Sequence, residues 1–124
     1  MRMLQYLLCM TFVASLSAAA IAQCADDRWF ATGTLRGASH VLGPFKSLPE
    51  CDEARKHDAA RFSFLSAAES AKLPGLRSRV LSAAKDGRAR MRLAQAELDG
   101  HAEAADVYQE LAFLWSGGSI CERR

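Results

Sequence analysis

Hydrophobic and polar positions alternate from Arg28 to Phe45, the first regular pattern after the N-terminal segment. One side of the alternation carries Trp29, Ala31, Gly33 and Leu35. A period of two is typical of a half-buried β-strand. Gly37-Ala38-Ser39 has turn composition, and residues 40–45 return as an edge strand, because Pro44 cannot donate a ladder hydrogen bond. The pattern predicts a β-hairpin over residues 28–45.

The apolar spacing changes to three and four after Ser47, which predicts a helix over residues 48–72. Ser47 is suited to cap this helix, and Glu50 completes a capping box. We expect the helix to end at Leu73-Pro74-Gly75, because proline and glycine together favour a turn.

Two further segments keep the helical spacing. The first is a helix over residues 75–99, or a helix pair interrupted at Asp86-Gly87. The second is a helix over residues 101–116, separated from the first by Gly100. Residues 117–124 are expected to form a tail that returns to the body of the domain. The apolar stripes of these segments include Leu76, Val80, Met91, Leu98, Tyr108, Leu111 and Trp115.

The residues around Gly100 resemble part of a tetratricopeptide repeat, at Leu93-Ala94, Ala104, Tyr108 and Leu111-Ala112. The resemblance spans about 25 residues and has no second copy in the chain. Such solenoids need about three repeats to bury a core. We therefore expect a plain helical hairpin that turns at Gly100.

Residues 1–22 have the pattern of a cleaved export signal, with a basic start, an apolar run and the small-residue end Ala20-Ile21-Ala22. A single exported domain over residues 23–124 would follow, in the periplasm or secreted. Ile21-Ala22-Gln23-Cys24 also resembles the bacterial lipobox, a resemblance that implies lipidation of Cys24 and a membrane-tethered lipoprotein.

The cysteine count bears on both interpretations of the N-terminus. After loss of the signal the chain keeps Cys24, Cys51 and Cys121, an odd number for an oxidising compartment. If Cys24 carries lipid, Cys51 and Cys121 are left to pair. Otherwise Cys24 is an alternative partner for either cysteine, or it bridges two chains. We expect one disulfide and favour Cys51–Cys121.

The charge is nearly balanced over the chain and biased in one segment. The 16 basic and 14 acidic residues become 15 and 14 when Arg2 leaves with the signal. This balance argues against binding to nucleic acid, or to a membrane unless Cys24 is lipidated. Basic side chains crowd residues 77–92, which is either a solvated face or a docking site for a protein partner in the cell envelope. The candidate partner-binding residues are Arg77, Arg88 and Arg92.

Catalytic and metal-binding motifs are missing from the sequence. It has no G-x-S-x-G, no glycine-rich phosphate loop, no C-x-x-C and no H-E-x-x-H. Cys51, His40, His57 and Glu53 are potential ligands near one another, without the spacing of a metal site. We predict no metal, no cofactor and no enzymatic activity.

These patterns together predict a mostly helical α+β domain, with an N-terminal β-hairpin packed on three to four amphipathic helices and one disulfide. The favoured function is that of a small exported, non-enzymatic protein acting through protein contacts. The alternative is a periplasmic binder of a small ligand or metal that uses Cys51 and His57. The sequence predicts neither the oligomeric state nor the biological process.

Overall fold

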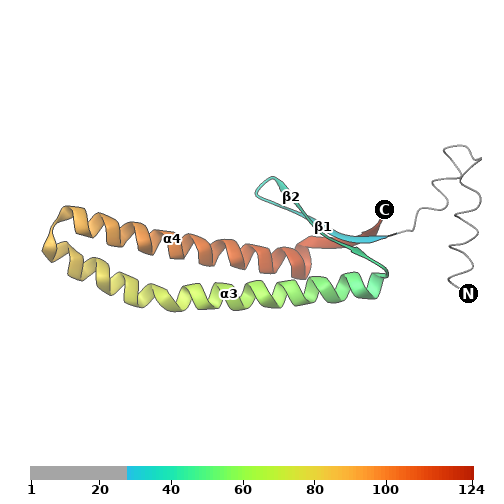
Figure 1. Cartoon of the computed structure of the whole chain (residues 1–124), viewed down its shortest axis with the longest axis horizontal. Coiled ribbons are helices and arrows are strands. Elements are labelled where there is room, and N and C mark those ends of the chain that lie inside the picture. Colours follow the sequence, from blue (N-terminus) through green and yellow to red (C-terminus); the bar gives the residue numbers. More distant parts are fainter. Residues whose placement is uncertain (1–27) are drawn as a thin grey trace, which may run out of the picture.

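The computed structural model of the protein describes residues 28–124 (Figure 1). The expected signal segment and Cys24 lie outside these residues. Two long helices, α3 (Leu48–Ala83) and α4 (Arg88–Phe113), form an antiparallel hairpin that extends from a small β-sheet at one end. The remaining elements are β1 (Trp29–Leu35), β2 (Ala38–Phe45), the short 3-10 helix η1 (Ala84–Asp86), the π-helical turn η2 (Leu114–Gly118) and β3 (Ser119–Arg123).

The sheet has three antiparallel strands in the order β2-β1-β3. β1 and β2 are joined at Arg36 and Gly37, whose positive φ angles of 50° and 77° are those of a two-residue hairpin turn. This turn comes one residue before the Gly37-Ala38-Ser39 turn that composition suggested. The C-terminal tail forms β3 on the other side of β1, so that the two ends of the domain share one sheet.

The predicted fold class is confirmed at the coarse level, since the protein is α+β, mostly helical and closed by a disulfide. The prediction of three to four helices is wrong, because two long helices replace them. The predicted β-hairpin is not an independent unit, because β3 completes the sheet. None of the described helices is both long and apolar enough to cross a membrane.

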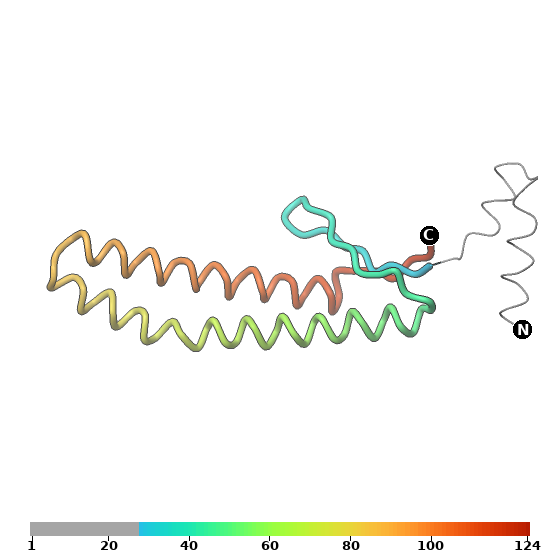
Figure 2. Tube along the Cα trace, in the orientation of Figure 1, coloured from blue at the N-terminus to red at the C-terminus, as the bar shows by residue number. Residues whose placement is uncertain are grey.

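The predicted break at Leu73-Pro74-Gly75 is wrong, because α3 continues through it to Ala83. Proline in a helix interior removes one backbone hydrogen bond and costs about 3 kcal/mol relative to alanine. Pro74 faces solvent, so water can reach the carbonyl group that loses its partner. Leu76, two residues later, is buried at 6% exposure and holds the second half of α3 onto α4. Figure 2 shows α3 curving toward α4 in this half.

The chain also does not turn at Gly100, which lies inside α4, so neither the predicted helical hairpin nor a tetratricopeptide-like unit forms there. The turn between the long helices is at η1 and Gly87 instead. Gly87 has a φ of 113°, a conformation that side-chain-bearing residues rarely adopt. The Asp86-Gly87 interruption that the pattern allowed is therefore the point at which the chain reverses.

The small core lies where the sheet meets the base of the helical hairpin. Its buried residues are Ala31, Cys51, Leu114 and Trp115, with Trp29 and Phe45 packed against them. Gly33 is needed here, because a β-carbon at this position would lie 2.5 Å from Leu114 Cδ1.

The structure contains the disulfide Cys51–Cys121, one of the pairings that the sequence left open. This bond joins the first turn of α3 to β3. Arg55 reinforces the connection, since its Nη1 donates to the Ser119 carbonyl oxygen at 2.6 Å and its Nη2 donates to Asp52 at 2.9 Å. The sheet end of the molecule is thus held by covalent and polar links.

Candidate functional site

The three arginines predicted to bind a partner lie near the far end of the helical hairpin. Arg77 is on the last third of α3, and Arg88 and Arg92 are on the first two turns of α4. All three side chains are exposed. The turn at Gly87 brings these segments side by side at the end of the molecule opposite the sheet (Figure 1).

Helical periodicity places the three arginines on one side of the hairpin. Arg79 and Glu97 form an ion pair of 3.2 Å across the helices and mark the opposite side. Arg77 is two residues from Arg79 and so points about 160° away from it. On α4, Arg92 and Arg88 lie about 140° and 180° around the helix from Glu97.

Leu81 extends this surface with apolar area, because it lies one turn after Arg77 and is 72% exposed. We call Arg77, Leu81, Arg88 and Arg92 the basic face.

The arginines of the basic face have no partner within the described part of the chain, where none takes part in a hydrogen bond or ion pair. Two neighbouring arginines differ, since Arg79 pairs with Glu97 and Arg90 lies 3.9 Å from Asp86. Arg88 is the first residue of α4, where the helix dipole disfavours a cation. Arg88 and Arg92 are also like charges one turn apart, which weakens a helix. The positions of Arg88 and Arg92 therefore do not stabilise α4.

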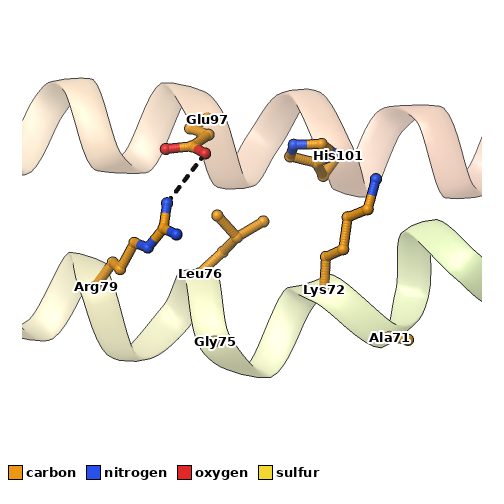
Figure 3. Close-up of a pocket in the computed structure, with 7 residues that line it drawn as sticks. All are labelled: Ala71, Lys72, Gly75, Leu76, Arg79, Glu97 and His101. Carbon is orange, nitrogen blue, oxygen red and sulfur yellow. Dashed lines mark hydrogen bonds and ion pairs between the residues drawn. The ribbon is translucent and has the colours of Figure 1, made fainter.

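A groove lies on the other side of the hairpin, between α3 and α4, with a volume of about 360 Å³. Figure 3 shows Lys72, Leu76 and Arg79 reaching from α3 toward Glu97 and His101 on α4. Ala71 and Gly75 complete its rim. The groove is a shallow depression in the helix interface, lined by both polar and apolar residues.

The charged groups of this groove are paired with one another. Glu69 is hydrogen-bonded to Nδ1 of His101, and its other oxygen lies 3.1 Å from Lys72 Nζ. The hydrogen bond with His101, and secondly the one with Lys72, lowers the pKa of Glu69 below its ordinary value. Arg79 is held by Glu97. The arrangement ties α3 to α4 and leaves no unpaired carboxylate among these residues for a ligand.

The sheet is fixed to α4 by a second polar cluster, centred on the hairpin turn. Arg36 donates from Nε and Nη2 to Glu110 at 2.8 and 3.0 Å, and from Nη1 to Glu103 at 3.0 Å. These bonds raise the pKa of Arg36, and the hydrogen bond from Arg36 lowers the pKa of Glu110. The cluster orients the β1–β2 hairpin along α4.

The potential metal ligands do not assemble into a site. Cys51 is bonded to Cys121, so it has no free thiolate to offer. His57 is 81% exposed at its side chain, beside Asp58. Across residues 28–124 no three His, Cys, Asp or Glu side chains lie where they could hold a metal ion.

Comparison of the chain with protein-family models, with curated proteins and with solved structures finds no match in any of the three.

Proposed function

We propose that this chain is a small exported protein without catalytic activity, and that it works by binding an acidic protein in the cell envelope through the basic face. Export is supported by the signal-like pattern of residues 1–22. It is also supported by the disulfide, since such bonds persist in oxidising compartments such as the periplasm. Lipidation of Cys24 would tether the same module to a membrane.

The observation that carries the proposal is the presence of unpaired arginines where the helix itself disfavours them. The positive charge of Arg88 interacts unfavourably with the dipole at the N-terminus of α4. Arg92, one turn later, repels Arg88 because both carry a positive charge. A carboxylate-bearing partner would relieve both effects, since arginine forms strong two-pronged hydrogen bonds with carboxylates. Leu81, one turn after Arg77, offers an exposed apolar contact on the same face. A partner with acidic side chains around an apolar patch fits this surface.

The test is capture of the envelope partner, in the native host, by the wild-type chain and by the variant Arg88→Glu/Arg92→Glu. We expect the variant to lose the partner and the wild-type complex to weaken as salt is raised. The variant should fold normally, because glutamate near the N-terminus of α4 suits the helix dipole.

The matched control is Lys46→Glu/Lys56→Glu, which makes the same change in charge at exposed positions near the sheet end. It should retain the partner. Partners that remain bound to the arginine variant as tightly as to the control would refute the docking role of the basic face.

A further inference from the structure

One side of α3, turned out from the interface with α4, carries no charge over several turns, and two of its residues, Ala71 and Gly75, also border the groove. We call it the outer face, and it consists of Ala60, Phe64, Ala68, Ala71, Gly75 and Ser78, all of them exposed. No described element packs against this side of the helix (Figures 1 and 2). In Figure 3 Leu76 points toward α4. An uncharged helix face of about 27 Å in contact with water is unusual in a surface helix.

Phe64 and Gly75 are the two residues of this face that have no evident role in the fold of the single chain. Phe64 is a large apolar side chain that is 74% exposed. Gly75 weakens the interior of a helix relative to alanine. Nothing in its surroundings requires a glycine, because an added β-carbon would have no neighbour within 4 Å. The face thus presents one protruding ring and one missing side chain.

The ring and the gap are matched in position. They are 11 residues apart, which is close to three turns, so they lie on the same side of α3 about 16 Å apart. Phe64 comes four residues before Ala68, and Gly75 comes four residues after Ala71. A two-fold axis between Ala68 and Ala71 therefore places each Phe64 opposite Gly75 of an antiparallel copy. Such an interface is isologous, as closed dimers require.

The cations that border the outer face do not oppose this contact, because each is neutralised within its own chain. Lys72 lies 3.1 Å from Glu69, and Arg79 lies 3.2 Å from Glu97. Arg61 lies 3.6 Å from Asp58. The small side chains at Ala68 and Ala71 allow the two helices to approach closely, which increases the number of van der Waals contacts.

We propose that the outer face of α3 binds the same face of a second copy of this chain, with Phe64 of each copy seated over Gly75 of the other. The two rings together bury about 300 to 500 Å². The contact remains at the small end of specific interfaces, below about 1,200 Å² in total. The dimer is accordingly a reversible one that dissociates at micromolar concentrations.

The test is sedimentation analysis of the chain across a concentration series from about 1 μM to 1 mM. Cys24 is replaced by Ser throughout, so that no disulfide through it can join two chains. We expect a monomer–dimer equilibrium in this range. Phe64→Ser should weaken it by at least about 100-fold, because each substitution removes two rings from the interface.

Two further variants separate the proposed contact from other effects. Gly75→Leu fills the gap and should also abolish the dimer, while it raises the melting temperature of the monomer because leucine favours the helix. Phe113→Ser removes a ring that is equally exposed, at 71%, but lies on α4, and it should leave the dimer unchanged. A chain that stays monomeric at every concentration would overturn the proposal, as would a dimer that tolerates both Phe64→Ser and Gly75→Leu.

Discussion

Glu69 and Glu110 are carboxylates whose protonation the fold opposes. Glu69 accepts hydrogen bonds from His101 and Lys72, and Glu110 accepts them from Arg36. Both pKa values lie below the ordinary value of 4.5. A carboxyl group with a lowered pKa in the folded state contributes stability that is fully present above the unfolded-state pKa. That contribution is lost as the pH falls through the lower folded-state pKa.

We therefore expect Glu69→Gln to be less stable than the wild-type chain at about pH 6, and the difference to shrink at about pH 3. Urea unfolding of both proteins at the two pH values measures this change. Glu53→Gln is the control, since Glu53 is an exposed carboxylate on the same helix. A gap between wild type and Glu69→Gln that stays constant with pH would contradict the role given to the Glu69 carboxylate.

Among the helices, substitution of Pro74 tests whether α3 is one continuous helix or two shorter helices. In a continuous helix, Pro74→Ala restores the backbone hydrogen bond to the carbonyl of Ser70 and removes a steric conflict. We expect the free energy of unfolding to rise by about 1 to 3 kcal/mol, as measured by urea denaturation.

Pro49→Ala provides the comparison, because Pro49 lies in the first turn of α3, where the missing N–H has no helical partner in any case. This substitution should be neutral or slightly destabilising. If Pro74→Ala gave no gain over Pro49→Ala, the continuity of α3 would be in doubt.

The sequence predicted those elements whose signals are local. The start of α3 follows from Ser47, whose hydroxyl accepts from the backbone N–H of Glu50 at 3.3 Å. The pairing of β1 with β2 follows from alternation around a tight turn. Pro74 and Gly100 misled the prediction because local propensity favours a break at each, whereas packing between α3 and α4 keeps both helices intact. β3 was missed because its partner, β1, is distant in the sequence.

The candidate site was predictable in its residue types and not in its geometry. Composition identified the cations of residues 77–92, but their shared face depends on the location of the turn at Gly87. The groove pairs were missed for the same reason. The sequence pattern predicted one break at residues 73–75 and another at Gly100. Glu69 and His101 then lay on separate helices whose relative positions the sequence did not predict. Once α3 and α4 are continuous, their contact follows from antiparallel packing.

At the scale of the whole described structure, residues 28–124 form a long helical hairpin that is anchored at one end by the sheet. A helix of the length of α3, 36 residues, spans about 54 Å. The sheet, the disulfide and the Arg55 bonds to Ser119 and Asp52 hold its base, while the basic face lies at the opposite end. Contacts at the far end are thereby presented well clear of the sheet, on a helix pair whose base cannot open without breaking these links.

A disulfide closes this base. Cys51–Cys121 links residues 70 positions apart, and a loop of that size lowers the entropy of the unfolded chain by an amount equivalent to about 4 kcal/mol. We expect Cys51→Ala/Cys121→Ala to lose roughly this much stability in urea denaturation. Cys24→Ser should unfold like the wild-type chain, because the bond joins Cys51 to Cys121. If Cys24→Ser were destabilised as much as the double variant, the protein would pair its cysteines differently, and β3 would lose its covalent connection to α3.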